Sequence, residues 1–400
     1  MSEMIRLKYV SSINEDVLEE DADPGFEFLY VDISAVGQGT LALPAEPTRF
    51  SVAPSRARRL AVAGDTVVST VRTYLRAVAQ VPATDDPLVF STGFAVVSPD
   101  RQRVYPRYLT WQLQADNFIS TVESISTGVS YPATSAAAIG DIGVRIPPLD
   151  VQRAVADFLD RETAKIDTLL AKQEELGHAV REHLHGLQDG LVSLSEGGVR
   201  FKYLVDEVDC RAGAEWERLP LLSVSIHWGV RRRDEVTDDL PRAEDLSNYK
   251  VVESGDIVVN RMRAFQGALG RSPINGIVSP DYLVLRAAAN VRSDWLAAAM
   301  RTPEFISEMA ARVRGIGSAE LGTVRTPRIN ADELGEIRLA VPWLAEQEAR
   351  YVTRQRSESQ AVVLLERIGS LTDALKERRA ALITAAVTGT LDVSTYGKAG

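Results

Sequence analysis

The chain has 400 residues, of which 45% are hydrophobic and 25% charged, and this length and composition predict a globular chain of two or three domains with real cores. No apolar run approaches the roughly 18 residues of a membrane span and no signal-peptide pattern opens the chain, so we expect a cytoplasmic protein with no membrane partner. The single Cys210 excludes a disulfide framework and any multi-thiolate metal site, and the net charge of −10 by itself argues mildly against nucleic acid as a partner.

The predicted elements form a globular segment and then a long helix, twice over. Short β-branched runs such as Thr66–Val71 and Asp256–Val259 alternate with Gly, Pro and Asp, and one helix follows each set. Prolines end both globular segments, because a helix can begin just after them but cannot run through them. The expected parts are a globular domain at 1–148, a long helix at 149–193, a second globular domain at 194–342, a second long helix at 343–392 and a tail at 393–400.

The same landmarks recur in the same order at a shift of about 190 residues, which is the signature of an internal repeat. Each copy carries a Gly-Asp pair followed by β-branched residues, and an Arg eight positions after the Gly. Later, Phe118-Ile119-Ser120 is repeated letter for letter as Phe305-Ile306-Ser307. The remaining matches are Arg6–Val10 with Arg200–Leu204, Gly64–Val68 with Gly255–Val259, Ser91–Phe94 with Ser279–Tyr282, and Gln152 with Gln347.

Both long helices show heptad-like apolar spacing. A helix of about 40 residues would be about 60 Å long, so it needs a partner along its length. We expect the two helices to pack antiparallel, although each could instead lie on its own globular domain. Gly177 and Gly186 weaken the first helix and mark either a close approach or a bend. The predicted seam positions are 166, 169, 173, 176, 180, 183 and 187 in the first helix and 364, 368, 371, 375, 378 and 382 in the second.

The fold class predicted from these elements is α+β, with two tandem globular domains separated by two long helices that form an antiparallel coiled coil. Lysine occurs at seven positions only, and none lies between Val10 and Ala164 or between Val251 and Leu375. This distribution excludes a Walker A phosphate loop and leaves no place for a carboxylate-and-lysine nuclease centre. There is no metal-binding motif, no serine-hydrolase elbow and no Asn/Asp-Pro-Pro-aromatic tetrapeptide of adenine methyltransferases, so we expect no catalytic residues, no metal and no enzyme activity.

Arginine gathers in two zones despite the negative net charge. Residues 49–107 hold nine Arg against four acids, and residues 257–328 hold ten Arg against five acids. Arginine contacts both phosphate and guanine edges, and Gln can pair with adenine, so these zones are predicted to bind DNA. Any single aromatic among them could equally be a core residue. The candidate DNA contacts are Arg72, Tyr74, Arg76, Ser130 and Tyr131 in the first copy and Arg261, Arg263, Phe265, Gln266, Arg325 and Arg328 in the second.

With the repeat laid out, the chain resembles the specificity subunit of type I restriction-modification enzymes over almost its full length. The segments Ile146–Leu149, Gln152–Ala156 and Phe158–Asp167 are similar to the family's central conserved region. The Gly64-Asp65 pair, Ser91–Phe94, Gly128–Pro132, Asn260–Met262 and Gly276–Pro280 are also family-like. The second conserved region departs from the pattern, because Trp343 replaces the second proline.

The resemblance implies two target recognition domains, each reading half of a split double-stranded DNA sequence in the major groove. It further implies that the helices set the gap between the half-sites and dock two methyltransferase subunits. S-adenosylmethionine would then belong to those subunits, and ATP and Mg to a motor and nuclease subunit where one is present; this chain would hold no cofactor. The residues expected to contact the partner are Gln152, Arg153, Phe158, Asp160, Arg161 and Gln347.

Two other classes of protein remain open on the sequence alone. One is a fused restriction or modification enzyme with an unrecognised catalytic site, which would methylate DNA without partners. The other is a coiled-coil scaffold that binds only protein, for which the arginine zones would be irrelevant to DNA.

Overall fold

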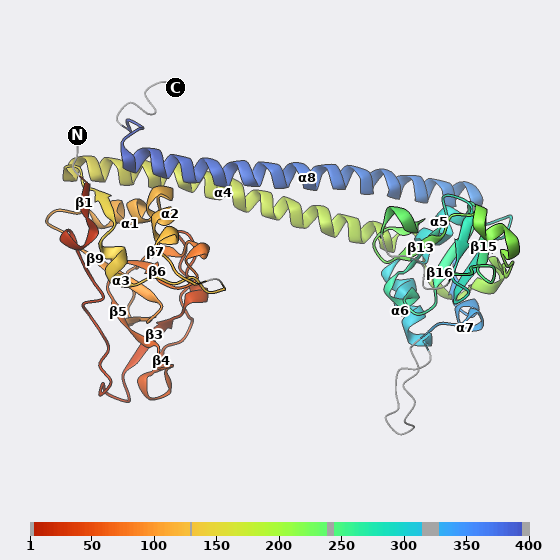
Figure 1. The fold of residues 1–400 in the computed structure, drawn as a ribbon, viewed down its shortest axis with the longest axis horizontal. Coiled ribbons are helices and arrows are strands. Elements are labelled where there is room, and N and C mark those ends of the chain that lie inside the picture. The colour runs from red at the N-terminus through yellow and green to blue at the C-terminus, as the bar shows by residue number, and fades with distance from the viewer. Residues whose placement is uncertain (1–3, 129, 238–243, 314–327, 394–400) are drawn as a thin grey trace. The chain divides into compact units, whose positions relative to one another are not determined.

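The structure is a computed structural model that describes residues 4–128, 130–237, 244–313 and 328–393. Its contacts divide the chain into two compact units, Met1–Glu174 with Gly369–Gly400 and Glu175–Ile368. Each unit holds one globular part and a portion of both long helices, α4 (Leu149–Asp189) and α8 (Leu344–Thr388) (Figure 1).

The globular part of the first unit contains two four-stranded sheets, ordered β2-β9-β6-β7 and β4-β3-β8-β5. Every pair in the first sheet is antiparallel, whereas β3 and β8 run parallel. The antiparallel pair β1-β10 joins the start of the chain to the strand that precedes α4. The strands are β1 (Met4–Arg6), β2 (Ser11–Ile13), β3 (Glu27–Val31), β4 (Thr48–Arg49), β5 (Ala57–Ala61), β6 (Thr66–Ser69), β7 (Val78–Gln80), β8 (Leu88–Ser91), β9 (Phe94–Pro99) and β10 (Gly143–Arg145), and the helices are α1 (Pro106–Gln114), α2 (Asp116–Ser124) and α3 (Ala136–Gly140).

The globular part of the second unit repeats this plan. Its four-stranded sheet is ordered β12-β19-β16-β17, and β11 pairs with β20 next to the start of α8. The hairpin β13-β14 and the antiparallel pair β15-β18 complete it. The strands are β11 (Leu194–Arg200), β12 (Val205–Glu207), β13 (Leu222–Ser225), β14 (Gly229–Arg232), β15 (Lys250–Val252), β16 (Ile257–Asn260), β17 (Leu269–Arg271), β18 (Gly276–Val278), β19 (Tyr282–Ala287) and β20 (Arg338–Leu339), and the helices are α5 (Ser293–Ala299), α6 (Pro303–Arg312) and α7 (Ala331–Gly335).

The internal repeat is confirmed strand by strand. The sheet order β2-β9-β6-β7 of the first unit corresponds to β12-β19-β16-β17 of the second, and the pair β1-β10 corresponds to β11-β20. The helices α1, α2 and α3 correspond in chain order to α5, α6 and α7. The two copies differ in the additional strands, which form a second four-stranded sheet only in the first copy among the described residues.

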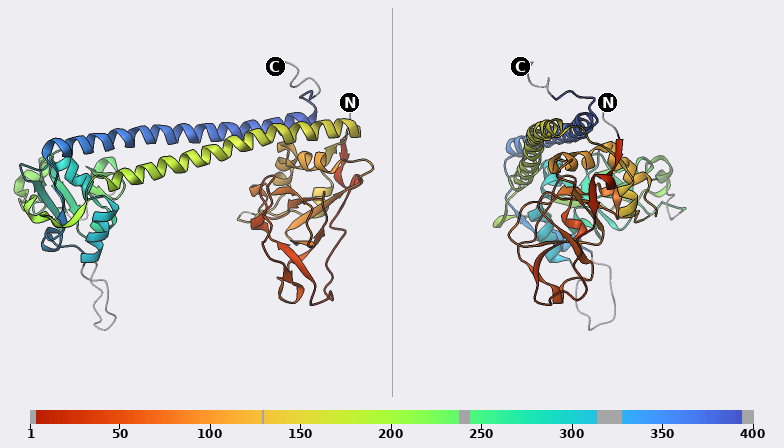
Figure 2. Two further views of the ribbon diagram at one scale, coloured as in Figure 1. Left: turned by 180° about the vertical axis from the view of Figure 1, so that it is seen from behind. Right: turned by 90° about the vertical axis from the view of Figure 1, so that its left-hand side faces the viewer.

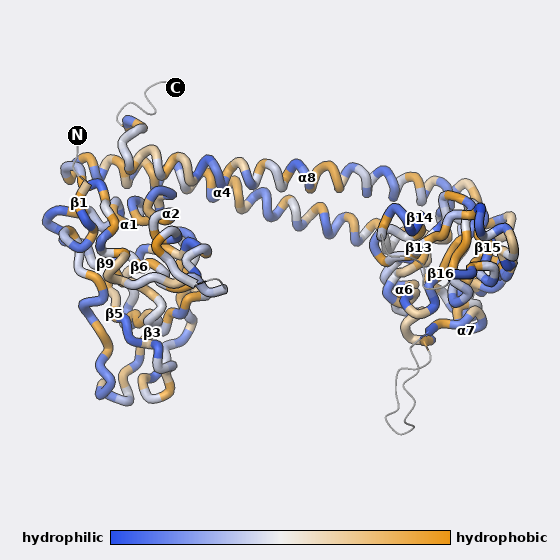
Figure 3. Tube along the Cα trace, in the orientation of Figure 1, coloured by the Kyte–Doolittle hydropathy of each residue, from blue (hydrophilic) through white to orange (hydrophobic). Residues whose placement is uncertain are grey.

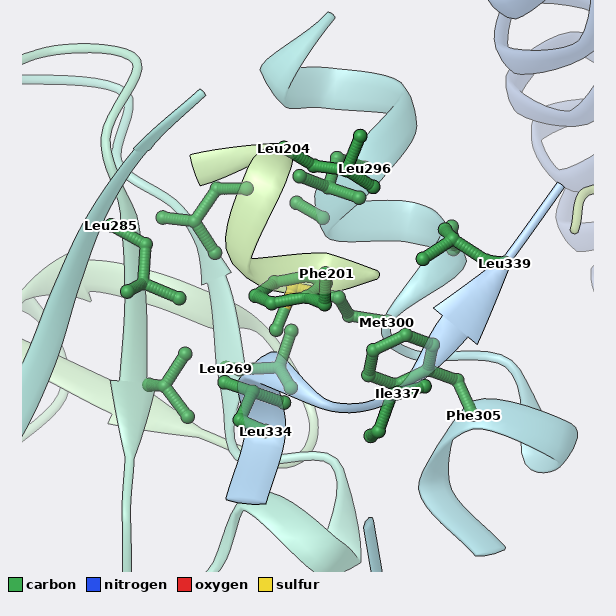
Figure 4. Packing of buried hydrophobic residues seen from close by; sticks show 14 of the residues in the cluster. Phe201, Leu204, Leu269, Leu285, Leu296, Met300, Phe305, Leu334, Ile337 and Leu339 are labelled. Carbon is green, nitrogen blue, oxygen red and sulfur yellow. The ribbon is translucent and has the colours of Figure 1, made fainter. Parts of the chain in front are cut away.

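The landmark aromatic residues of the repeat are core residues in both copies. Phe118 and Phe305 are both buried, on α2 and α6. Phe305 packs edge-on against Phe201, with ring centroids 5.7 Å apart, and Figure 4 shows both rings among leucine and isoleucine side chains of the second unit. Each buried Phe removes enough apolar surface from water to stabilise the fold by about 1.5–3 kcal/mol. The letter-for-letter match therefore marks a packing constraint rather than a binding site.

The two long helices pack antiparallel within each unit, as the sequence predicted. In the first unit Val155 and Leu159 of α4 lie in one apolar cluster with Ile383 and Val387 of α8. In the second unit Gly177 of α4 is buried, and its ideal Cβ position lies 4.0 Å from Cγ2 of Ile368 of α8, an ordinary van der Waals distance, so this residue faces the partner helix. Figures 1 and 2 show the two helices side by side from opposite directions.

Half of the predicted seam is wrong. Positions 166, 173, 180 and 187 of α4 and 368, 375 and 382 of α8 are buried or half-buried, as expected. The other predicted positions are exposed, namely 169, 176 and 183 of α4 and 364, 371 and 378 of α8. Their next neighbours face inward instead: 170, 177 and 184 of α4 and 365, 372 and 379 of α8. The inward-facing positions of the two helices still correspond at a shift of 195 residues, because 170 and 184 of α4 match 365 and 379 of α8.

Apolar and polar residues alternate along both long helices, as the hydropathy colouring in Figure 3 shows. Within the described ranges, no helix combines the length and the apolar character needed to cross a membrane.

The seam assignment can be tested with two leucines ten positions apart on α4. Leu159 is fully buried, whereas Leu169 is 47% exposed. We expect Leu159→Ala to lower the free energy of unfolding by about 2–5 kcal/mol, because it leaves a cavity in the helix interface. Leu169→Ala should change it by less than about 0.5 kcal/mol, as surface substitutions do. Urea unfolding followed by circular dichroism measures both, and equal losses would contradict the observed seam.

Candidate nucleic-acid interface

In the first unit the candidate surface is built on the short loop between β6 and β7. A single 3-10 turn, Thr73–Leu75, is flanked by Arg72 and Arg76, which both adopt left-handed backbone with φ of 51° and 55°. Such conformations cost non-glycine residues of the order of 1–3 kcal/mol each and persist only where the surroundings enforce them. Two such residues around one turn indicate a loop whose shape serves a purpose other than stability.

Arg76 supplies much of that enforcement. Its guanidinium bonds to Asp116 at 2.6 Å and to Glu123 at 3.0 Å, which ties the loop to α2. These contacts, with the Glu123 hydrogen bond the largest, raise the pKa of Arg76. The Thr73 hydroxyl adds a hydrogen bond of 2.9 Å to Ser126. Arg76 was predicted to contact DNA, but its guanidinium is already engaged by two carboxylates, so the geometry favours a structural role.

Arg72, Tyr74 and Tyr131 are exposed in this loop region, as is Leu75 at 49%, which the sequence did not single out. Tyr74 and Tyr131 are 53% and 66% exposed, and the Arg72 guanidinium stacks 5.1 Å from the centre of the Tyr131 ring. The backbone N–H of Arg72 donates to the Pro132 carbonyl at 2.8 Å, which holds Tyr131 and Pro132 beside the turn. Ser130 is exposed next to Tyr131. The structure therefore brings together the candidates that the sequence placed in two separate segments.

The equivalent loop of the second unit lies between β16 and β17 and presents a different set of side chains. Arg263 and Gln266 are exposed around the turn Ala264–Gln266. Arg261 instead bonds to the Ile329 carbonyl and to Asn330, and Phe265 packs on the core. The predicted equivalence of Tyr74 and Phe265 therefore holds for chain position but not for exposure.

Two further candidates of the second copy are Arg325 and Arg328. Arg328 is exposed, and Arg325 lies outside the described residues. The sequence analysis missed Met262, which is 40% exposed beside Arg263. It also missed a pocket of about 330 Å³ next to Arg263, lined by Ser225, His227, Asn260, Arg263 and Tyr282. Of these pocket residues, Asn260 was noted in the sequence, but only as part of the family-like segment Asn260–Met262 and not as a binding residue.

The glutamines expected to bind a partner are buried inside the protein. The Gln152 carbonyl oxygen accepts from the Tyr105 N–H at 2.7 Å, and its amide donates to the carbonyls of Arg103 and Pro147. Gln347 makes the same three bonds in the second copy, from Arg292 and to Asn290 and Pro342. Both side chains are fully buried, so neither is available to a partner in this conformation.

The other expected partner contacts divide into buried and exposed residues. Phe158 is 3% exposed and belongs to the core between α1 and the long helices. Asp160 accepts hydrogen bonds from Arg107 and from the Trp111 ring, and so holds α1 against α4. Arg153 and Arg161 remain on the surface.

The described residues contain no group of three or more His, Cys, Asp or Glu side chains placed to hold a metal ion.

This architecture is similar to that of known structures, although the sequence matches no family model and no curated protein. A chain from a structure on the assembly and conformational transition of the type I R-M system matches with 20% identity and a TM-score of 0.71, over 97% of this chain and 98% of that one. The HsdS subunit from Thermoanaerobacter tengcongensis matches with 21% identity and a TM-score of 0.58, over 97% of both chains.

These matches define a two-domain fold with a pair of long helices. It is the fold of the HsdS specificity subunit of type I restriction-modification systems, as the sequence resemblance implied.

The buried glutamines give a test of the junction between each globular part and its long helix. Gln152→Ala and Gln347→Ala should each lower the free energy of unfolding by about 1–3 kcal/mol, because buried backbone groups lose their only side-chain partner. Gln360→Ala, at an exposed position of α8, is the matched control and should have an effect below about 0.5 kcal/mol. Thermal unfolding of the three variants measures this, and a neutral Gln152→Ala would show that the junction does not depend on the amide.

Proposed function

We propose that this chain is the DNA-specificity subunit of a type I restriction-modification complex. It reads a bipartite double-stranded DNA target, with one half-site for each globular domain, and performs no chemistry itself. The likeness to the HsdS fold and the absence of catalytic motifs from the sequence support this proposal. Methylation would take place in partner subunits that bind S-adenosylmethionine.

One observation carries the proposal: the same strand-loop-strand element presents an exposed arginine in each copy. Arg72 follows β6 and Arg263 follows β16, on equivalent sheets. An exposed guanidinium can bond to O6 and N7 of guanine, and the exposed Gln266 amide has the donor and acceptor that adenine requires. Because Tyr74 is exposed where Phe265 is only half-exposed and packs on the core, the two loops differ in chemistry and would read different half-sites.

The net charge of −10 does not contradict DNA binding. Each arginine zone, 49–107 and 257–328, holds five more arginines than acids, while the acids concentrate outside these zones, at 1–27, in the first long helix and at 206–245. Binding through such local basic surfaces depends on the nearby charges, since at physiological salt charges are screened beyond about 8 Å.

The long helices are proposed as the dock for two methyltransferase subunits and as the spacer between the half-sites. A spacer of fixed length makes the second half-site an intramolecular target only when the span matches, which adds to specificity. Of the residues expected to contact the partner, we retain Arg153 and Arg161. The exposed Trp343, at the start of α8, joins them, because a large aromatic side chain that is 87% exposed is a typical interface residue.

The test is to coexpress the chain with its methyltransferase subunits and to map methylated adenines genome-wide. Arg72→Ala should relax one half-site and Arg263→Ala the other, because each loses a contact worth about 1–3 kcal/mol of discrimination between bases. Arg218→Ala is the matched control at an exposed position outside both loops and both arginine zones, and it should leave the motif unchanged.

A contiguous methylated motif would contradict the bipartite target. Methylation by the purified chain alone would instead establish an enzyme. Unchanged half-sites in both arginine variants would remove the two loops from the recognition surface.

A further inference from the structure

The two copies of the repeat differ in the side chains at one contact between the first helix of the globular part and a long helix. In the first copy Trp111 of α1 and Leu159 of α4 are both buried in the apolar cluster that joins the two helices. The hydrogen bond from Tyr105 to Gln152 corresponds to the bond from Arg292 to Gln347, which gives a shift of 187 residues for α1 and α5 and of 195 residues for α4 and α8. By these shifts, Trp111 corresponds to Ala298 on α5 and Leu159 to Arg354 on α8. A large ring has been exchanged for a methyl group, and a buried leucine for an arginine.

The exchange leaves a pocket of about 580 Å³ in the second unit. This volume falls in the ~300–1,000 Å³ range of small-molecule sites. The pocket lies between the β13–β14 turn, the end of β17, helix α5 and helix α8. Its chemically distinctive lining residues are His227, Trp228, Arg271, Arg301, Tyr351 and Arg354.

Two of its arginines, Arg301 and Arg354, lie near enough for their charges to interact, and the Glu358 carboxylate lies near both while it is bonded to Arg354. Arg354, whose side chain is 12% exposed, bonds to Glu358 at 2.7 Å and to the Ala298 carbonyl at 3.1 Å. Arg301 donates to the Ile226 carbonyl at 2.5 Å, and among the described residues no ion pair within 4.0 Å is recorded for it. Burial, and secondarily the charge of Arg354, lower the pKa of Arg301.

The acids in the wall are already engaged. Asp294 takes two hydrogen bonds from Arg292, and Glu358 is bonded by Arg354. Counting Arg271 as well, the pocket therefore carries an excess of positive charge. A partly buried guanidinium without a counter-ion is costly, and a bound anion would offset that cost.

Aromatic rings complete the lining. Trp228 is 40% exposed, Tyr351 faces the same space from α8, and the His227 ring centre lies 6.3 Å from that of Trp228. Gly229, which follows Trp228 in the chain, has a φ of 73°, a backbone conformation that favours glycine. A Cβ atom at this position would lie only 3.3 Å from Nη1 of Arg301, so the glycine also leaves room for the guanidinium.

We propose that this pocket binds a nucleoside phosphate, with the phosphate held by Arg301 and Arg354 and the base stacked on Trp228 or Tyr351. Arginine makes bidentate contacts to phosphate, and aromatic side chains stack on any base. The nucleoside phosphate is either a free nucleotide or a nucleotide of bound DNA. This binding is independent of the reading loops proposed above, so either proposal can fail alone.

The experiment titrates the full chain with AMP, adenosine and inorganic phosphate, and follows calorimetric heat and tryptophan fluorescence. AMP should bind with a Kd of about 1 mM or tighter, and adenosine and inorganic phosphate at least about tenfold more weakly. Arg301→Gln and Arg354→Gln should each weaken AMP binding at least about tenfold. Arg356→Gln, an exposed arginine two residues along the same helix, is the matched control and should bind AMP as the unchanged chain does.

Ala298→Trp restores the ring of the first copy without removing a charge, and it should abolish AMP binding while the circular dichroism spectrum is preserved. Binding that survives Ala298→Trp, or no binding of AMP by the unchanged chain, would overturn the proposal. If inorganic phosphate bound as tightly as AMP, the proposed stacking of the base on Trp228 or Tyr351 would be overturned. If duplex DNA without the target sequence displaces AMP, the natural occupant belongs to DNA; if it does not, the occupant is a free nucleotide.

Discussion

Each long helix depends on one buried amide near its first turn. Gln152 and Gln347 are fully buried, and each accepts one backbone N–H, donates to a carbonyl just before α1 or α5, and donates to the proline carbonyl near the end of its globular part. A buried amide without these partners would cost the full desolvation of its polar atoms. The three bonds therefore fix the direction in which α4 and α8 leave their domains, and the packing of α1 and α5 on the helices follows from it.

The spacing of apolar residues predicted the long helices and their antiparallel packing, but it could not choose the seam. Leu169-Leu170 and Leu364-Leu365 are leucine doublets, so a step of three and a step of four fit equally well. The structure selects Leu170 and Leu365. Gly177 then becomes a buried seam residue that faces Ile368 of α8. Only the facing helix resolves this ambiguity, and a single sequence does not place it.

The recurrence of Arg and aromatic residues located the candidate surface but not the role of each side chain. Arg76 is paired with Asp116 and Glu123, which are 40 and 47 residues away, and Arg261 with Asn330, 69 residues away. Sequence separation carries no information about such contacts. A repeat shows which element recurs, and the fold then decides which of its arginines face solvent. In this chain those are Arg72 and Arg263.

The two copies keep the bonds that build the junctions and change the side chains around them. A substitution that serves packing alone tends to conserve volume, because cores tolerate loss and gain of volume poorly. The exchange of Trp111 and Leu159 for Ala298 and Arg354 conserves neither volume nor polarity. Glu358, one turn beyond Arg354, offsets part of the introduced charge, but it is bonded to Arg354, and in the described part of the chain no carboxylate lies within 4.0 Å of Arg301. Since a filled apolar contact is the simpler solution and the first copy has it, the open charged pocket of the second copy implies selection for something that enters it.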